Sequence, residues 1–294
     1  MFRSGFITII GRPNVGKSTL LNRIIGEKIS IVSNKPQTTR NRIQLIHTED
    51  RMQIVFIDTP GIQKPKNALG EYMLKISTSS WEDMDLILYM SDCSTETGPL
   101  EEMILSAVEN INTPVILVLN KIDTASKEEI IKAIEMFSQR REFEAIIPIS
   151  AIDGSGVDTL MDEIYNVLPE GPMYYPEDMI TDQPERFIIG EIIREKALQL
   201  LSEEVPHGIY VEVESVKSIP NTDRVEVGAV IYCERESHKG IVIGKGGKML
   251  KEIGTRSRED INRLLGTKTH LELWVKVEKN WRDRQQKIRN FGYQ

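Results

Sequence analysis

The sequence predicts an α/β domain with a mostly parallel sheet and helices on both faces, followed by a smaller α+β domain. Up to residue 168, short apolar β-rich runs alternate with amphipathic helical patterns, as in parallel sheets covered on both faces. Four prolines then fall within residues 169–184, a composition typical of a linker. Beyond the linker the order is helix, strand, strand, short helix, long helix, strand.

In the first domain, strands are expected at the apolar β-rich runs Phe6–Ile10, Gln53–Ile57, Leu86–Ser91, Val115–Leu119 and Ile146–Ile149. Helical apolar spacing between them predicts helices, among them Lys17–Ile25, Pro99–Asn110, Lys127–Arg140 and Val157–Leu168. Only a short polar turn separates Ile43–Thr48 from the strand that follows it. This edge pair is therefore predicted to be antiparallel.

The second domain is expected to contain the helices Phe187–Ser202 and Lys248–Leu265 and the strands Ile209–Lys217, Arg224–Glu234 and His270–Val277. We accordingly place the first domain at residues 1–170, the linker at 171–184, and the second domain with its basic tail at 185–294.

Composition excludes several classes of protein. The chain has 294 residues, 40% of them hydrophobic and 28% charged, which is ordinary for a soluble globular protein. Its longest apolar runs, such as Pro114–Leu119, are far shorter than a membrane span, and the N-terminus does not resemble a signal peptide. Cys93 and Cys233 fall in different predicted domains, so a reducing, cytoplasmic compartment without a disulfide is expected.

Charge is divided unevenly along the chain. The formal net charge is −7, but residues 1–180 hold 17 Lys and Arg against 26 Asp and Glu. Residues 239–294 hold 14 Lys and Arg against 6 Asp and Glu. An acidic first part and a basic last part indicate two tasks, the second involving an anionic partner.

The segment Gly11–Ser18 fits the phosphate-binding pattern GxxxxGK[ST], directly after a predicted strand and at the start of a helix. Its glycines allow backbone N–H groups to wrap phosphates, Lys17 supplies positive charge, and the Ser18 hydroxyl can ligate Mg²⁺. The predicted phosphate-binding residues are Gly11, Arg12, Pro13, Asn14, Val15, Gly16, Lys17, Ser18 and Thr19.

Two further motifs follow apolar strands. In Asp58-Thr59-Pro60-Gly61, the carboxylate can hold Mg²⁺ and the glycine N–H can approach a γ-phosphate. In Asn120-Lys121-Ile122-Asp123, the last carboxylate can accept from guanine N1–H and N2–H₂, a donor pair that adenine lacks. Asn120 is expected at the O6/N7 edge, and a backbone N–H of Ser150-Ala151 at O6. Together the motifs predict a Mg²⁺-dependent site for GTP and GDP.

A GxxG loop, Gly244-Lys245-Gly246-Gly247, lies between an apolar segment and the long helix. This is the pattern of a type II KH domain, in which glycines let an RNA backbone come close. The predicted RNA-binding residues are Gly244, Lys245, Gly246, Gly247, Lys248, Lys251, Arg256 and Arg258. Trp274, in an alternating strand, is expected in the core. Trp281, in the basic tail, is expected near RNA.

The three nucleotide motifs resemble those of the TrmE–Era–EngA class of P-loop GTPases. The resemblance implies a threonine that closes over Mg²⁺ and γ-phosphate, and Thr38 and Thr39 are both available. Thr39 is favoured, because members of the class carry this threonine directly before arginine. The implied catalytic residues are Lys17, Thr39 and Gly61, and the implied metal ligands are Ser18, Thr39 and Asp58.

Other residues of the two loops are interpreted by the same resemblance. Ile62 stands where Ras-type GTPases have a water-orienting glutamine, so another feature must orient water. Arg40 is a candidate for a catalytic arginine in cis, but the favoured interpretation is a solvated loop residue. Lys35 and Pro36 are expected at the surface, and Asn14 supports a hypothesis that K⁺ binds beside the phosphates.

Over nearly its whole length the chain resembles the Era family of bacterial ribosome-assembly GTPases. Further motifs that carry the resemblance are Tyr175-Pro176-Glu177-Asp178 and Glu272–Val277. The family implies binding near the 3′ end of 16S rRNA, a role in 30S subunit assembly and some peripheral membrane association; a monomer is expected. Two alternatives stay open: a GTPase that acts on a protein or membrane partner, and a static RNA-binding protein with structural GTP.

Overall fold

The computed structural model describes residues 1–294 except 80, 82, 95, 96 and 294. The contacts among the described residues divide the chain into two compact units. The first unit comprises Met1–Ser30, Thr39–Lys66 and Gly70–Asp182, and the second comprises Ile31–Thr38, Asn67–Leu69 and Gln183–Gln294. Among the described residues, no helix is both long and apolar enough to cross a membrane.

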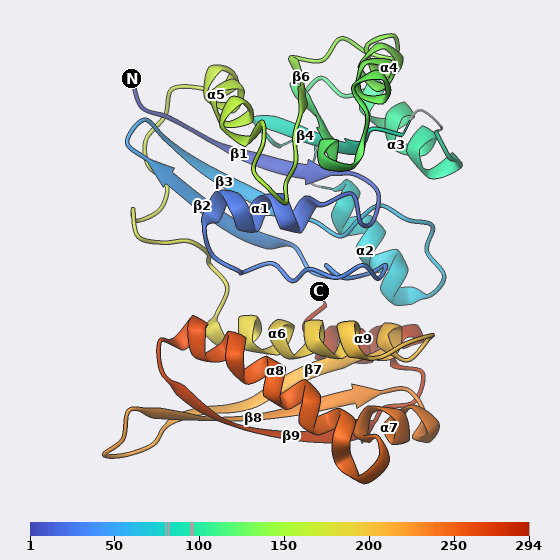
Figure 1. Ribbon diagram of the computed structural model, residues 1–294, viewed down its shortest axis with the longest axis vertical. Helices are drawn as coiled ribbons and strands as arrows, with labels where there is room; N and C mark the ends of the chain where they lie inside the picture. Colours follow the sequence, from blue (N-terminus) through green and yellow to red (C-terminus); the bar gives the residue numbers. More distant parts are fainter. Residues whose placement is uncertain (80, 82, 95–96, 294) are drawn as a thin grey trace. The chain divides into compact units, whose positions relative to one another are not determined.

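The first unit is built on a six-stranded sheet with the order β2-β3-β1-β4-β5-β6 (Figure 1). The strands are β1 (Arg3–Ile10), β2 (Ile43–Glu49), β3 (Met52–Asp58), β4 (Leu86–Asp92), β5 (Val115–Asn120) and β6 (Ala145–Pro148). Only β2 runs antiparallel to its neighbour; the other pairs are parallel. The predicted sheet, with its antiparallel edge pair, is confirmed.

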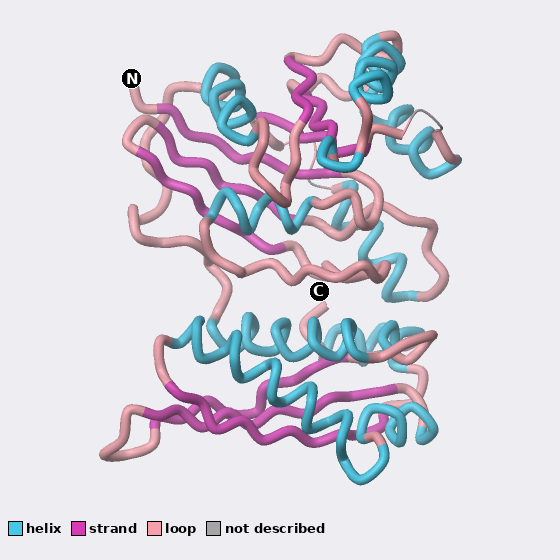
Figure 2. The backbone as a smooth tube through the Cα atoms, viewed as in Figure 1, coloured by secondary structure: helices cyan, strands magenta, loops and turns pink. Residues whose placement is uncertain are grey.

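Helices lie on both faces of this sheet (Figure 2), which explains why β3 and β5 are buried at every position. The helices are α1 (Lys17–Ile25), α2 (Ala68–Thr78), α3 (Pro99–Glu109), α4 (Lys127–Ser138) and α5 (Val157–Val167). The carboxyl ends of the parallel strands meet at one edge, so the motifs that follow β1, β3 and β5 are brought together.

The proline-rich segment after α5 lies along the edge strand of the same sheet. The Ile46 N–H donates to the Ile180 carbonyl at 2.9 Å. The Gln53 side chain accepts hydrogen bonds from the backbone N–H groups of Tyr174 and Tyr175 at 2.7 and 2.9 Å. These contacts place the segment up to Asp182 in the first unit, where it covers an edge that would otherwise expose unpaired backbone groups.

The second unit contains a three-stranded sheet with the order β7-β8-β9. The pair β7 (Tyr210–Ser218) and β8 (Arg224–Cys233) is antiparallel, whereas β8 and β9 (Lys268–Val277) are parallel. Its helices are α6 (Glu185–Leu200), α7 (Glu236–Ile243), α8 (Lys248–Leu265) and α9 (Gln285–Asn290). This order of elements is the one predicted for a type II KH domain, with α9 added by the tail.

The two tryptophans of the second unit differ in burial from what the sequence predicted. Trp281 is fully buried, and its Nε1–H donates to the Gly208 carbonyl at 2.9 Å. Trp274 points outward and is 46% exposed. The core placement of Trp274 was therefore wrong. Trp281 offers no free face for stacking, because the tail packs it against Phe291 and Tyr293 at ring distances of 5.2 and 6.0 Å; that the tail lies near RNA stays a prediction.

Candidate nucleotide and RNA sites

The phosphate-binding loop runs from β1 to α1 and depends on two glycines in left-handed conformations. Gly11 has φ +150°, and a Cβ there would lie 2.2 Å from the Met90 carbonyl oxygen. Gly16 has φ +110°, and a Cβ there would lie 2.2 Å from Asn120 Nδ2. No side chain fits in either place, so the loop must pass close to β4 and β5.

Lys17 is the first residue of α1 and is buried. Its Nζ donates to the carbonyls of Gly11 and Arg12, each at 3.1 Å, so the ammonium lies inside the curve of the loop. Burial lowers the pKa of Lys17 to about 8, against the opposing pull of Asp58. An anionic ligand in the loop would raise this pKa again, because it favours the charged form.

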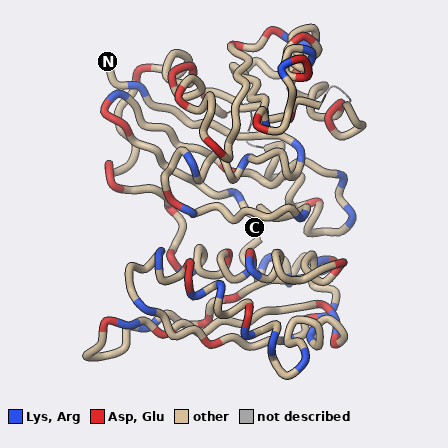
Figure 3. The backbone as a smooth tube through the Cα atoms, viewed as in Figure 1, with Lys and Arg blue, Asp and Glu red and all other residues tan. Residues whose placement is uncertain are grey.

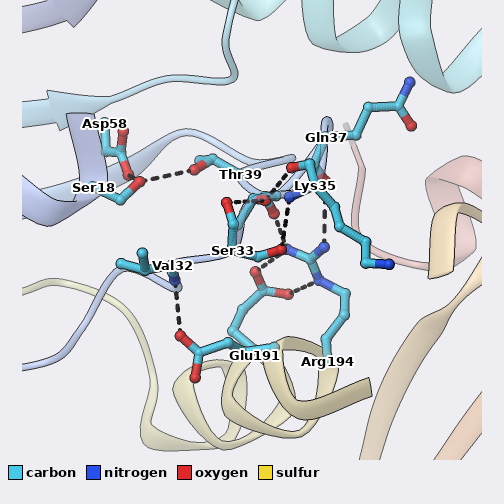
Figure 4. Close-up of polar contacts among 11 residues, drawn as sticks. Ser18, Val32, Ser33, Lys35, Gln37, Thr39, Asp58, Glu191 and Arg194 are labelled. Atoms are coloured by element: carbon cyan, nitrogen blue, oxygen red, sulfur yellow. Dashed lines mark hydrogen bonds and ion pairs between the residues drawn. The ribbon is translucent and has the colours of Figure 1, made fainter. Parts of the chain in front are cut away.

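Ser18, Thr39 and Asp58 bring three oxygen side chains together (Figure 4). Ser18 Oγ lies 3.2 Å from Thr39 Oγ1 and donates to Asp58 Oδ2 at 3.2 Å. Asp58 is fully buried, and desolvation raises its pKa to about 6. A buried carboxylate beside two hydroxyls is the hard oxygen set that Mg²⁺ prefers, so these residues fit the metal that the motifs imply.

The neighbouring threonine has other contacts. Thr38 Oγ1 donates to the Lys35 carbonyl at 2.6 Å, within its own loop. Of the two threonines, the structure thus places Thr39, which the family resemblance favoured, beside Ser18.

Gly61 approaches the phosphate-binding loop closely. A Cβ at this position would lie 3.0 Å from the Pro13 backbone and 3.2 Å from Lys17 Nζ. The Ile62 side chain is 3% exposed and packs into an apolar cluster with Ile10 and Tyr89. Ile62 is therefore a core residue that cannot orient water.

Of three loop residues expected at the surface, one is buried and one is partly buried. Arg40 is only 1% exposed, so the favoured interpretation of a solvated arginine was wrong. Lys35 is half-buried, and its Nζ donates to the Leu201 carbonyl at 2.7 Å. Only Pro36 is exposed as expected.

Arg12 is anchored by a set of contacts that sequence reasoning missed. Its Nη2 lies 3.0 Å from Asp92 Oδ1, and its Nε pairs with Glu101 on α3. Glu101 is 2% exposed and also accepts a hydrogen bond from Tyr89. The available signal was the position of Glu101, three residues before Ile104 on the apolar face of its helix.

Asn120 forms hydrogen bonds with two loops of the site. Its Nδ2 donates to the Val15 carbonyl at 2.7 Å, and its Oδ1 accepts from the Ala151 N–H at 2.9 Å. The side chain thus ties the phosphate-binding loop to Ser150-Ala151. Its Nδ2 carries a second hydrogen, so the contact with the base edge stays a prediction. Asp123 is exposed in the short turn after Lys121, where its carboxylate can receive a ligand.

The remaining nucleotide residues of the motifs have supporting positions. Thr59 is fully buried, and its Oγ1 donates to the Ile9 carbonyl at 3.2 Å. Pro60 and Val15 are buried, Thr19 is half-buried in α1, and Asn14 is exposed with φ +64°.

In the second unit, the GxxG loop joins α7 to α8. Gly246 and Gly247 have φ +62° and +76°, and a Cβ added at either would meet no atom within 4 Å. Gly244 differs, because a Cβ there would lie 2.9 Å from the Met249 backbone nitrogen. The loop is therefore open at its two later glycines and closely packed at its first.

Lysine and arginine positions recur along the chain at this loop (Figure 3). Lys245, Lys248 and Lys251 are exposed. Arg258 follows Lys251 by seven positions, so it lies on the same face of α8, where its Nη2 donates to Thr255 Oγ1 at 3.2 Å. Arg256 lies on another face and pairs with Glu252 at 2.8 Å. Four of the predicted basic residues thus lie on one surface at the loop, whereas Arg256 is held in an ion pair on another face of the helix.

Comparisons with protein families match both units. A family model described as "50S ribosome-binding GTPase" matches residues 6–121, and a KH domain model matches residues 204–282. The GTPase Era of Clostridioides difficile (strain 630) is 54% identical over 294 residues, covering 100% of this chain and 99% of the relative. The chain belongs to the Era family of GTPases. Era of Clostridium botulinum (strain Alaska E43 / Type E3) is 55% identical over the same coverage.

Solved Era structures have the same fold over the full chain. Era in complex with MgGDPNP and nucleotides 1506–1542 of 16S ribosomal RNA matches with a TM-score of 0.96 and 42% identity, covering 100% of this chain and 99% of that one. A variant of Aquifex aeolicus Era bound to GDP·AlF4⁻ matches with a TM-score of 0.95 and 42% identity, covering 99% of each chain. This Era-family chain is thus a GTPase with a C-terminal KH domain.

Proposed function

We propose that this Era-family GTPase is a switch that binds small-subunit rRNA at its GxxG loop and assists 30S subunit assembly. The observation that carries the RNA part is the open backbone at Gly246 and Gly247, with exposed lysines on either side. The relative solved with 16S rRNA supports the class of RNA, because it matches this chain from end to end.

In the proposed nucleotide site, the Gly11–Ser18 loop surrounds the phosphates with backbone N–H groups, and Lys17 places its ammonium against them. Asp123 selects guanine, since an unpaired carboxylate would remain if adenine were bound. Ser18, Asp58 and Thr39 would hold Mg²⁺, which neutralises charge on the phosphates when bound. Gly61 brings its N–H close to the terminal phosphate, because no Cβ intervenes.

Hydrolysis in this site would depend on positioning and charge more than on a side-chain base. Ile62 is buried in the core and contributes no hydrogen bond to water. Lys17 and the Gly61 N–H then stabilise charge on the transferred phosphoryl group, and Thr39 closes the site when GTP is present. We expect slow intrinsic turnover for this reason.

The RNA site is tested with glycine substitutions whose added side chain meets no neighbouring atom, although each puts a side chain at a positive φ. Gly246→Asp and Gly247→Asp place a negative charge where an RNA phosphate would lie, in space that is open in the free protein. We expect RNA affinity to fall by about 2 kcal/mol, roughly 30-fold, with GTP binding unchanged. The probe is the 3′-end fragment of 16S rRNA, followed by fluorescence anisotropy.

Gly266→Asp is the matched control for this experiment. Gly266 also has a positive φ, +63°, and open space around it, but it ends α8 at the opposite end from the loop. Equal losses for the loop and control variants would contradict the proposed site. Gly244→Asp is unsuitable, because its Cβ would strain the backbone at Met249.

Salt dependence provides an independent test of the lysines. If Lys245 and Lys248 each contact a phosphate, their replacement by alanine should lower the slope of log affinity against log salt by roughly one unit each. Unchanged slopes would place the RNA elsewhere on the chain.

The alternatives are separated by nucleotide state. The proposed switch binds RNA more tightly with a non-hydrolysable GTP analogue than with GDP, and by reciprocity RNA tightens GTP binding by the same factor, a coupling of about 1–3 kcal/mol. Equal RNA affinities together with measurable hydrolysis would leave two independent modules. Absence of RNA binding would favour a protein or membrane partner, and absence of hydrolysis would favour structural GTP.

Four finer properties belong to the same proposal through the family resemblance: a cytoplasmic location, peripheral membrane association, a monomeric state and K⁺ binding at Asn14. Equal hydrolysis rates in K⁺ and Na⁺ would remove the K⁺ site. Flotation with lipid vesicles tests the membrane association, and the molar mass in solution tests the monomer.

A further inference from the structure

The loop that leads to Thr39 is held by a helix far away in the sequence. Residues Ile31–Thr38 belong by their contacts to the second unit, and the partner element is α6 (Figure 4). At the start of the loop, the Val32 N–H donates to Glu195 Oε1 at 2.8 Å. The contact is made with the backbone, so it fixes the course of the loop whatever its side chains are.

Glu195 is itself firmly held. Its side chain is fully buried, and its other oxygen accepts from Lys196 Nζ at 2.9 Å. Lys196 in turn pairs with Asp260 of α8 at 2.5 Å. A buried carboxylate with a partner on each side has little freedom to move, so the first contact of the loop has a rigid support.

At the end of the loop, Arg194 forms the second contact. Its side chain is 1% exposed, and its Nε and Nη2 donate to the two carboxylate oxygens of Glu191 at 2.8 and 2.5 Å. The same guanidinium donates to the carbonyl of Thr38 through Nη2, and to that of Gln37 through Nη1 at 3.5 Å. Arg194 thus forms a bidentate ion pair and also donates hydrogen bonds to two successive backbone carbonyls.

The Thr38 carbonyl belongs to the same planar peptide unit as the Thr39 nitrogen. Fixing that carbonyl therefore fixes the plane from which Thr39 starts, leaving only its own φ and χ1 to place the hydroxyl. That hydroxyl lies 3.2 Å from Ser18 Oγ. A shift of about 1 Å in such a group can cost on the order of a hundredfold in rate.

We propose that Arg194, oriented by Glu191, is a positioning residue for GTP hydrolysis that acts through Thr39. The inference rests on the proposed role of Thr39 at Mg²⁺ and γ-phosphate. The proposal gives α6 a role in the nucleotide reaction, in addition to its packing against the sheet of the KH domain. Arg194 itself touches no reacting atom.

The test is a double-mutant cycle in single-turnover hydrolysis by the full chain without RNA. Arg194→Lys keeps the charge but cannot span both Glu191 and the Thr38 carbonyl. We expect it to lower the rate about tenfold, with GDP affinity unchanged and the half-saturating Mg²⁺ concentration raised only in the GTP state. Arg186→Lys, the same change at an exposed position of α6, should have no effect.

The cycle separates a positioning role from a structural one. If Arg194 acts through Thr39, then Arg194→Lys should cost nothing further in a Thr39→Ala protein. The same tenfold loss in both backgrounds would overturn the inference. A Thr39→Ala protein that hydrolyses GTP at the original rate would instead overturn the proposed role of Thr39.

Glu191→Gln provides a second variant in case Arg194→Lys does not fold. The amide still accepts from Arg194 but no longer neutralises it, so the guanidinium should hold the loop less firmly. We expect a loss of a few-fold that also disappears in the Thr39→Ala background. A loss that persists there would contradict the inference as directly as the first variant would.

Discussion

Trp281→Ala should destabilise the second unit far more than Trp274→Ala does. The Trp281 side chain is fully buried, and truncation of a buried tryptophan costs about 3–5 kcal/mol. The change also removes the donor that satisfies the Gly208 carbonyl, and an unsatisfied buried group costs about 1–3 kcal/mol. We therefore expect a loss of about 4 kcal/mol or more, a large share of the roughly 5–15 kcal/mol typical of a domain.

The comparison variant should change little. Trp274 is 46% exposed, and exposed substitutions usually stay within about 0.5–1 kcal/mol. Trp281→Phe should fall between the two, because it keeps most of the buried ring but loses the donor. The difference between the two alanine variants is thus about 3 kcal/mol, which corresponds to roughly a hundredfold in an equilibrium constant.

Hydrogen exchange followed by mass spectrometry measures this difference within the full chain. Peptides from residues 183–293 should lose about a hundredfold in protection in Trp281→Ala relative to Trp274→Ala. Peptides from the sheet of the first unit, and GDP affinity, serve as internal controls and should not change. Equal losses of protection in the two variants would refute the burial argument.

Three further predictions concern the nucleotide site. The pKa of Lys17, lowered from 10.5 to about 8, means that the nucleotide-free protein loses stability as the pH falls from 10.5 to about 8. GDP binding at pH 8 should therefore take up about half a proton, which calorimetry in buffers of different ionisation enthalpy can measure; no uptake would contradict the shift. Asp123→Asn should move preference from GTP towards XTP by about tenfold or more, and an unchanged competition ratio would refute the base assignment. Ile62→Ala should cost about 2–5 kcal/mol of stability with little change in single-turnover rate, so a rate loss of a hundredfold in a folded variant would show a catalytic role.

The sheet and the order of elements could be predicted because burial leaves a direct record in the sequence. Strands such as β3 and β5 are buried on both faces, so they contain the uninterrupted apolar runs 54–57 and Val115–Leu119. The three nucleotide motifs each follow such a strand, and the geometry of a parallel sheet then brings them to one edge. In the KH domain, the GxxG loop could be identified because its glycines stand directly before a helix, a pattern that is local in the sequence.

The tryptophans could not be assigned, because alternation identifies two faces of a strand without saying which one is covered. In β9, Trp274 alternates with Val275, and only the packing of distant elements determines that the valine faces inward. Trp281 lies in a basic tail, where composition favours solvent, yet it is buried beside Phe291 and Tyr293. Its environment is made by residues that have no periodic relation to it.

The partners of polar residues that are distant in the sequence could not be predicted either. The contacts of Asn120 with backbone groups of two other loops were not predicted. Arg40 was expected in solvent and is buried. The type of a charged or amide residue does not say whether it is buried or exposed, so only the folded structure shows its partners.

The attachment of the Ile31–Thr38 loop to α6 has a consequence for the order of events during synthesis. Val32 precedes its partner Glu195 by 163 positions, and Thr38 precedes Arg194 by 156. At about 5–20 residues per second, the ribosome needs roughly ten to thirty seconds to make the intervening chain. Throughout this time the nascent sheet can form, but its loop has no helix to hold it. The loop that leads to Thr39 thus reaches its final course only after the chain has been made as far as α6.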